Sequence, residues 1–301
     1  MKNQTIGVEI EMTGITRKEA AEAVAKYFGT RVKVLRDGYS SYGAEDKQGR
    51  MWKFSYDSSI KAQKKTSEGK IKNLGDWDNE NDYKVELVTP ILKYEDIETL
   101  QEIVRTVKEA GAFVNKSGGM HVHIGANGFT AKSLKNLLKY VASREQIFYA
   151  AVGTYESRKR YCKPADERII AEVVKKNPKT LEQFKNIWYN GEPSRANRHY
   201  DNSRYTVLNL HAFFSKGTIE YRLFNATLHA GEVKSYVQFC LAVTNFAKTA
   251  NSAVYKAKTD RFAERMQMIL EYVGLTGEEF KTCRYHMLKN LKESAVAIAV
   301  A

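Results

Sequence analysis

The segment 117–125, with the sequence SGGMHVHIG, alternates three apolar residues with two histidines. Side chains of an extended strand point alternately to its two faces, so Met120, Val122 and Ile124 share one face while His121 and His123 share the other. We therefore predict a strand with a buried apolar side and two imidazoles that face a metal ion or a phosphate. Imidazoles also satisfy ordinary local hydrogen bonds, so the prediction depends on whether other strands supply further ligands.

Three further segments show the same layout, in which an apolar face backs a face with charged groups. The charged residues are Glu9 and Glu11 in segment 5–12, Glu86 in segment 83–88, and Glu220 and Arg222 in segment 217–225. If these strands belong to one sheet, the carboxylates line a single acidic pocket. Carboxylates that lie close together raise each other's pKa, so the arrangement favours bound cations. Oxygen-rich ligation suits Mg²⁺ or Mn²⁺, and Arg222 would contact a phosphate held by the metal.

Each of these groups also has a purely structural interpretation. Glu9 and Glu11 could occupy the solvated face of an edge strand, and Glu86 could lie at the surface. Glu220 and Arg222 could form a cross-strand ion pair. The functional interpretation is favoured because four separate strands carry acids and imidazoles, where a solvent face would carry a mixture of Lys and Thr.

Helical patterns separate these strands. One helix begins with a capping box of Thr16 and Glu19 and ends at Gly29, and further helical patterns cover residues 95–110, 130–148, 158–188 and 232–291. We predict strands over residues 204–213 and 217–225, joined as a hairpin by a short turn at Gly217. Residues 61–82 are predicted to form an irregular surface excursion, and the basic runs 158–160 and 175–176 to be solvated helix faces.

Composition sets the class of protein. The 301 residues are 43% hydrophobic, which is enough for a globular core. A net charge of +13 attracts anions such as nucleotides, acidic metabolites or nucleic acid. The three cysteines, Cys162, Cys240 and Cys283, match no metal-ligand spacing or disulfide framework, which favours the reducing cytoplasm. The chain shows no signal peptide and no apolar stretch of ~20 residues, so we expect no membrane span.

Five motifs, taken in order, resemble the amidoligases, which are carboxylate-amine ligases of the glutamine synthetase and glutamate-cysteine ligase superfamily. The motifs are G-x-E-x-E at Gly7 to Glu11, D-x-S at Asp57 to Ser59, E-x-x-T-P at Glu86 to Pro90, G-G-M-H-x-H at Gly118 to His123, and I-E-x-R-L-F-N at Ile219 to Asn225. The resemblance covers roughly residues 5 to 250, and the order of the motifs makes it specific.

The resemblance implies an α+β fold with a curved antiparallel sheet, similar to that of glutamine synthetase, and helices packed on its outer face. We expect residues 1–255 to form the catalytic domain and residues 256–301 a helical extension packed on it. The implied reaction phosphorylates a carboxylate with ATP at a site with more than one Mg²⁺ ion, for which Mn²⁺ could substitute. An amine then captures the acyl phosphate. The partners are a small-molecule or peptide carboxylate and an amine, and neither a membrane nor nucleic acid is expected.

The resemblance also implies roles for individual residues. Glu9, His121 and Glu220 would hold the metal nearer the transferred phosphate, and Glu11 and Glu86 the metal nearer the acyl group. His123 and Arg222 would contact nucleotide phosphates, and Asp57 would lie near the incoming amine. Arg160 and Arg204 are candidates for contacts with the substrate carboxylate or with phosphates. Metals and guanidinium groups would neutralise phosphate oxygens and align the reactants.

The chain departs from the larger synthetases in ways that leave its substrates and oligomeric state open. Thr218 stands where glutamine synthetases carry an arginine, and the charged segment before Glu86 is long. Two other functions also stay open. A hydrolase could bind Zn²⁺ or Mn²⁺ through His121 and His123, and a nucleic-acid-binding protein could use the basic charge with 18 tyrosines for stacking.

Overall fold

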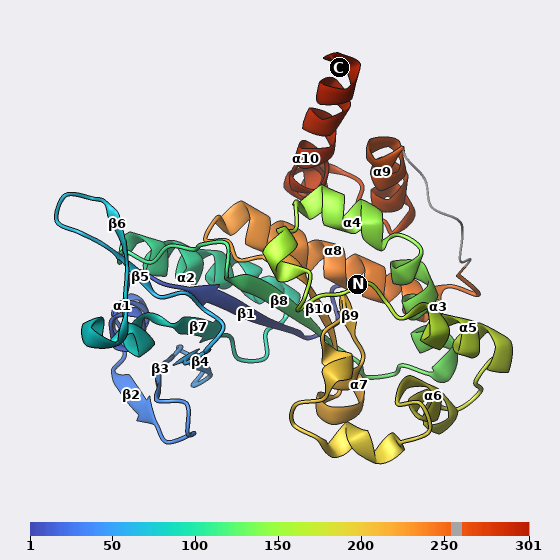
Figure 1. Cartoon of the computed structure of the whole chain (residues 1–301), viewed down its shortest axis with the longest axis horizontal. Helices are drawn as coiled ribbons and strands as arrows, with labels where there is room; N and C mark the ends of the chain where they lie inside the picture. The colour runs from blue at the N-terminus through green and yellow to red at the C-terminus, as the bar shows by residue number, and fades with distance from the viewer. Residues whose placement is uncertain (254–260, 301) are drawn as a thin grey trace. The chain divides into compact units, whose positions relative to one another are not determined.

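The computed structural model describes residues 1–253 and 261–300, with residues 292–300 as backbone only, and shows an α+β protein (Figure 1). The strands are β1 Ile6–Met12, β2 Val32–Leu35, β3 Ser41–Glu45, β4 Met51–Ser55, β5 Gln63–Lys65, β6 Ile71–Asn73, β7 Val85–Val88, β8 Gly119–Gly125, β9 Leu208–Asn209 and β10 Thr218–Asn225. The α-helices are α1 Arg17–Phe28, α2 Ile97–Glu109, α3 Ala131–Ala142, α4 Glu145–Val152, α5 Glu167–Lys176, α6 Leu181–Trp188, α7 His211–Lys216, α8 Ala230–Thr249, α9 Phe262–Tyr272 and α10 Lys281–Val300. Short 3-10 helices are η1 Asp76–Asp78, η2 Glu80–Tyr83, η3 Tyr94–Asp96, η4 Glu156–Arg158, η5 Pro193–Asn197, η6 Asn202–Arg204 and η7 Glu278–Phe280.

Eight strands form one large sheet in the order β2-β3-β4-β7-β1-β8-β10-β9, and β5 and β6 form a separate two-stranded sheet. Antiparallel registers join β1 to β7, β4 to β7, β3 to β4, β2 to β3, and β9 to β10. The predicted large antiparallel sheet with helices is therefore present. None of the described helices is long and apolar enough to span a bilayer.

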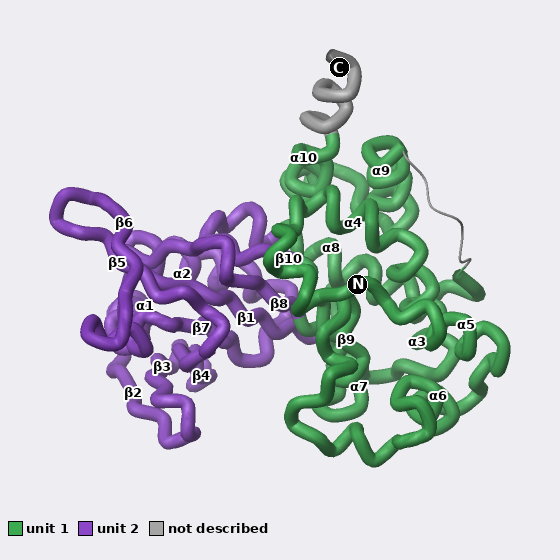
Figure 2. Tube along the Cα trace, in the orientation of Figure 1, with its two compact units in different colours: residues 1–4, 123–223, 235–301 green, residues 5–122, 224–234 purple. Residues whose placement is uncertain are grey.

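The chain divides into two compact units (Figure 2). Unit 1 comprises Met1–Gln4, His123–Leu223 and Ser235–Ala301, and unit 2 comprises Thr5–Val122 and Phe224–Lys234. Strands β8 and β10 each continue from one unit into the other. The predicted boundary at residue 255 stays a prediction, and the first residues of the predicted extension, 256–260, lie outside the described residues.

Unit 2 is built on strands with one apolar face. Ile6, Val8, Ile10 and Met12 of β1 are at most 2% exposed, as the alternation of the sequence predicts. Helix α1 packs against β3 and β4. Its capping box of Thr16 and Glu19 and its left-handed end at Gly29, with φ of 70°, are also as predicted. The apolar packing fixes which face of β1 is left for Glu9 and Glu11.

Unit 1 is mostly helical. Helices α4, α9 and α10 pack against each other, and Phe148 of α4 meets Phe239 of α8 edge-on at a ring distance of 5.0 Å. Tyr221 of β10 shares a hydrogen bond of 2.8 Å with Thr244 of α8. This contact joins the apolar side of β10 to helix α8, so the opposite side of the strand is left for Glu220 and Arg222.

The predicted hairpin over residues 204–225 is wrong in its first half. The strand β9 contains only Leu208 and Asn209, and helix α7 follows it because the Asn209 side chain accepts a hydrogen bond from the Ala212 backbone at 3.2 Å. His211 is buried against Tyr189, whose hydroxyl lies 2.6 Å from its Nδ1. Gly217, with φ of 70°, ends α7 and is no hairpin turn. The local hydrogen bond of Asn209 and the contact of His211 with Tyr189, 22 residues earlier in the chain, therefore overrode the local alternation.

Two other predicted elements differ in detail. The segment 61–82, predicted to be irregular, contains β5, β6, η1 and η2, and Gln63 is tied to Thr13 by two hydrogen bonds of 2.8 and 2.9 Å. The predicted helix over residues 130–148 is interrupted at Ser143 and Arg144, so that α3 and α4 are separate helices.

Candidate metal centre

Three carboxylates of unit 2 come from two neighbouring strands. Glu9 and Glu11 lie on β1 and Glu86 lies on β7, and the antiparallel register places Glu11 directly opposite Glu86. Residues opposite each other in such a pair point to the same face, so the register alone brings these carboxylates together. Glu11 is only 4% exposed. The predicted convergence of strands β1 and β7 is therefore present in the structure.

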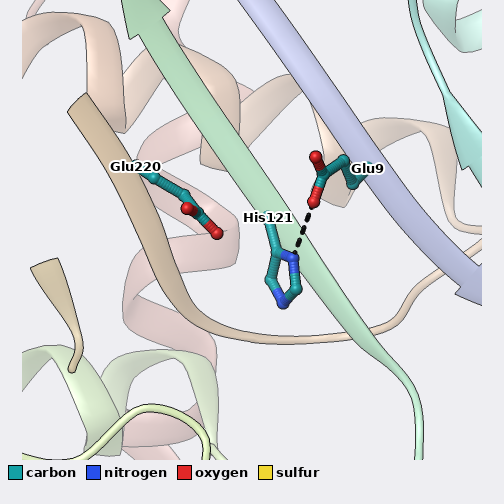
Figure 3. A group of neighbouring side chains, drawn as sticks. All are labelled: Glu9, His121 and Glu220. Carbon is teal, nitrogen blue, oxygen red and sulfur yellow. Dashed lines mark hydrogen bonds and ion pairs between the residues drawn. The ribbon is translucent and has the colours of Figure 1, made fainter. Parts of the chain in front are cut away.

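His121 of β8 joins this group of acids. Its Nδ1 lies 3.0 Å from Oε2 of Glu9 (Figure 3), and its Nε2 lies 3.9 Å from Oε1 of Glu11. The imidazole is buried, with 4% of the residue exposed. A carboxylate that accepts the Nδ1 proton fixes the tautomer, so that Nε2 carries the lone pair toward the acids.

The donor set fits a divalent cation. Glu11, Glu86 and His121 each offer one ligand atom, and these three atoms lie within 4.8 Å of one another. Two further contacts orient the carboxylates: the Gly119 backbone donates to Oε2 of Glu11 at 2.8 Å, and the Ser55 hydroxyl lies 3.5 Å from Oε2 of Glu86. Carboxylate oxygens with one imidazole nitrogen suit Mg²⁺ or Mn²⁺, which keep several waters among their ligands.

The electrostatics of Glu86 reflect the same crowding. Burial raises the pKa of Glu86 well above its usual value, and the negative charges of Glu9, Glu11 and Asp57 raise it further. Lys53 opposes this increase only in part. A bound divalent cation would reverse the balance, because its charge favours the ionised carboxylate.

The predicted ligand Glu220 belongs to unit 1, where it is 2% exposed; Figure 3 labels it as well. Asn209 donates to its Oε2 at 2.5 Å, and the Arg222 guanidinium donates to its Oε1. His123 of the same unit lies 3.9 Å from Oε1 of Glu220 through Nε2, and its Nδ1 lies 3.0 Å from the Thr218 hydroxyl. The ion pair considered from the sequence is therefore present, although its partners stand two residues apart on one strand and are buried.

Residues 2–244 match the sequence model of a protein family described as "Putative amidoligase enzyme". The chain belongs to the amidoligase family. The match covers most of the chain and agrees with the family that the five motifs resemble. A comparison with curated proteins finds no match. The family indicates a ligase of some kind, and the carboxylate cluster of this amidoligase is its candidate centre.

A loop of the amidoligase carries Asp57 and is hydrogen-bonded to the residues just before β8, the strand that contains His121. Oδ1 of Asp57 accepts a hydrogen bond of 2.7 Å from the Ser59 backbone. Further along, the Lys61 backbone donates to the Ser117 hydroxyl at 2.9 Å, and Asn115 donates to the Lys61 carbonyl at 2.9 Å. These bonds hold the loop of Asp57 against the residues that precede His121.

Gly118 allows the histidine strand to approach β1. A Cβ atom at this position would lie 3.2 Å from the Glu11 carbonyl oxygen and 3.0 Å from the Ala226 Cβ. Sequence reasoning identified the glycine but missed Ser55, Asn115 and Ser117. The polar residues Asn115 and Ser117 just before the glycine pair were the available signal, because such residues often close turns on their own backbone.

The remaining predicted residues, Arg160 and Arg204, contact tyrosines and not the carboxylates of the predicted ligand set. The Arg160 guanidinium lies 4.7 Å from the Tyr161 ring centre, and that of Arg204 lies 5.3 Å from the Tyr200 ring and 5.8 Å from the Tyr205 ring. Arg204 stands in η6 and not in the predicted strand. Stacking on aromatic rings holds a guanidinium plane in place while its edge can still bind an anion.

Proposed function

We propose that this chain is an ATP-dependent ligase that joins a carboxylate to an amine through an acyl phosphate. The observation that carries the proposal is the convergence of Glu11, Glu86 and His121, whose ligand atoms lie within 4.8 Å of one another in a member of the amidoligase family. Amide formation needs an activated carboxylate, and phosphoryl transfer needs divalent cations beside the phosphate oxygens. A cluster of acids in a basic protein meets that need.

The proposed reaction has two steps. A carboxylate oxygen of the substrate attacks the γ-phosphorus of ATP and ADP leaves, which gives the acyl phosphate. The amine nitrogen then attacks the acyl carbon, inorganic phosphate leaves, and the nitrogen loses a proton. The products are an amide, ADP and phosphate, so release of ADP reports the first step independently of the amine.

We assign different roles in the reaction to the residues of unit 2. Glu11, Glu86 and His121 would hold Mg²⁺ or Mn²⁺, and the cation would neutralise phosphate oxygens as charge moves onto them. Glu9 accepts the Nδ1 proton of His121 through Oε2, so it orients the imidazole in addition to its predicted role as a ligand. Asp57 would accept the proton of the amine, since its backbone contact with Ser59 occupies Oδ1 and leaves Oδ2 for a substrate.

Expectations from the family complete the proposal. Glu220 would be a further metal ligand, His123 and Arg222 would contact nucleotide phosphates, and Arg160 and Arg204 would contact the substrate carboxylate or phosphates. The fold would be that of glutamine synthetase, for which an antiparallel sheet flanked by helices is the required framework. Nδ1 of His121 contacts Glu9 and Nδ1 of His123 contacts Thr218, so both histidines keep Nε2 for a ligand, and release of ADP distinguishes the ligase from the alternative hydrolase.

Release of ADP tests the proposal. The full chain is incubated with ATP, Mg²⁺ and mixtures of carboxylates and amines, and ADP is measured by coupled assay with Glu11→Gln and the exposed Glu22→Gln as matched variants. We expect ADP release that requires Mg²⁺, persists in Glu22→Gln and disappears in Glu11→Gln. Metal-dependent hydrolysis without ADP under all mixtures would exclude the ligase and support the hydrolase.

A further inference from the structure

A surface pocket of unit 1 lies at the turn between α5 and α6, in a segment with no assigned role. Its volume is about 400 Å³. It is lined by Lys176, Asn177, Pro178, Lys179, Gln183, Asn186 and Ile187. Ligand pockets for small molecules have volumes of this order, so the pocket is large enough for a small ligand and too small for a protein partner.

A row of lysines on α3 extends to the same turn. Lys132, Lys135 and Lys139 are spaced by three and four residues, which places them on one side of the helix. The Lys135 ammonium donates to Oδ1 of Asn177, which ends α5 in the left-handed region with φ of 43°. This bond places the Lys135 ammonium beside Asn177, which is one of the residues that line the pocket.

The lysines around this turn repel each other. Partial burial lowers the pKa of Lys135, and the ammonium groups of Lys179, Lys139 and Lys132 lower it further. In the part of the chain that the structure describes, Lys176 pairs with Glu172 at 2.6 Å, but no carboxylate lies within 4.0 Å of the ammonium groups of Lys132, Lys135, Lys139, Lys175 or Lys179. Lys175 and Lys176 are exposed, as the sequence predicted for a solvated helix face, and the additional feature of this turn is that Lys135 of a separate helix approaches it.

We propose that this pocket binds a compact anion with two or more phosphate groups. Lys135 and Lys179 supply the charge, because an ammonium group binds phosphate oxygens as a point charge from many directions. Gln183 adds a neutral donor: its carboxamide oxygen accepts the backbone N–H of Lys179 at 2.8 Å, and its NH₂ group is left for a ligand. The site lies wholly within unit 1 and does not depend on the metal centre.

Calorimetry with inorganic triphosphate tests the site on the full chain. EDTA is present so that metal-bound phosphate does not contribute, and the salt concentration is about 0.15 M so that the general field of the protein is screened. The variants are Lys179→Gln, the double variant Lys135→Gln/Lys179→Gln, and the control double variant Lys18→Gln/Lys26→Gln on exposed positions of α1. The control removes the same charge from unit 2, which does not contain the pocket.

We expect saturable binding that the pocket double variant weakens at least tenfold, that Lys179→Gln weakens several-fold, and that the control changes less than twofold. Unchanged thermal melting of Lys179→Gln would show that the loss is not unfolding. A second titration uses ATP in place of inorganic triphosphate. Equal affinity for the two ligands indicates that the pocket recognises phosphate groups alone, and tighter binding of ATP indicates a nucleotide. Equal weakening by both double variants, or no saturable binding of triphosphate while an oligonucleotide binds, would overturn the proposal.

Discussion

Two buried clusters stand on strands of the same design and balance their charge in different ways. In unit 1, the carboxylate of Glu220 receives hydrogen bonds from Arg222 and Asn209. In unit 2, the carboxylates Glu9, Glu11 and Asp57 raise the pKa of Glu86, and Lys53 opposes them only in part. A guanidinium partner neutralises the charge of a buried carboxylate, whereas clustered carboxylates repel each other unless a cation binds among them. The same sequence pattern therefore serves two electrostatic purposes.

The largest expected effect is on the unit 1 cluster. Glu220→Gln leaves the buried Arg222 without its carboxylate, and breaking a buried pair costs about 3–5 kcal/mol. Urea unfolding should show this loss in the free energy of unfolding, together with the loss of metal-dependent ATP turnover expected from the family. Arg168→Gln breaks an exposed pair with Asp166 and serves as the control, with an expected change below about 1 kcal/mol. Unchanged stability of Glu220→Gln would remove the contrast between the two clusters.

Glu86→Gln in unit 2 should not lower stability, in contrast to Glu220→Gln. Removing one negative charge from a crowded group relieves repulsion, so we expect the variant to melt no lower than the parent protein in EDTA. The parent should gain stability with Mg²⁺, by about 2.7 kcal/mol when the ion is at a hundredfold excess over its Kd, and the variant should lose this gain. Thermal melting with and without Mg²⁺ measures both. A variant that melts lower in EDTA and still responds to Mg²⁺ would show that Glu86 is a structural residue.

His121 and His123 differ in the partner that each Nδ1 contacts, which allows a further test of the difference between the two clusters. Nδ1 of His121 contacts the carboxylate of Glu9, whereas Nδ1 of His123 contacts the hydroxyl of Thr218. Loss of the carboxylate that orients a metal-binding histidine lowers metal affinity by about 10–100-fold, so Glu9→Gln should weaken Mn²⁺ binding in that range. Thr218→Val should change it less than twofold. Titration of Mn²⁺ by electron paramagnetic resonance measures both, and equal effects would assign both histidines to one metal ion.

The sequence could predict the faces of the strands but not every neighbour. Alternation is local, so the orientation of Glu9, Glu11 and His121 follows from the residues alone. The register that sets Glu11 opposite Glu86 depends on pairing between strands more than 70 residues apart, which no local pattern fixes. The error at residues 204–213 has a related origin, because His211 packs against Tyr189, which lies 22 residues earlier in the chain. The lysine pocket was missed because α3 and the turn at Asn177 meet only in the folded chain.

The smallest expected effect concerns the loop of unit 2 that carries Asp57 and Lys61. Ser117→Ala removes the hydroxyl that accepts the Lys61 backbone N–H, and one such hydrogen bond is worth about 1 kcal/mol. We expect a decrease of about 2 °C in Tm and faster amide exchange at Lys61, because its donor then faces solvent. Ser67→Ala, on an exposed turn, is the control and should change neither. Exchange rates around Glu220 should stay the same, since Lys61, Asn115 and Ser117 all belong to unit 2. If Ser117→Ala also increased amide exchange around Glu220, the clusters of Glu220 and Glu86 would unfold as one cooperative structure. The two clusters would then differ only in how their charges are balanced.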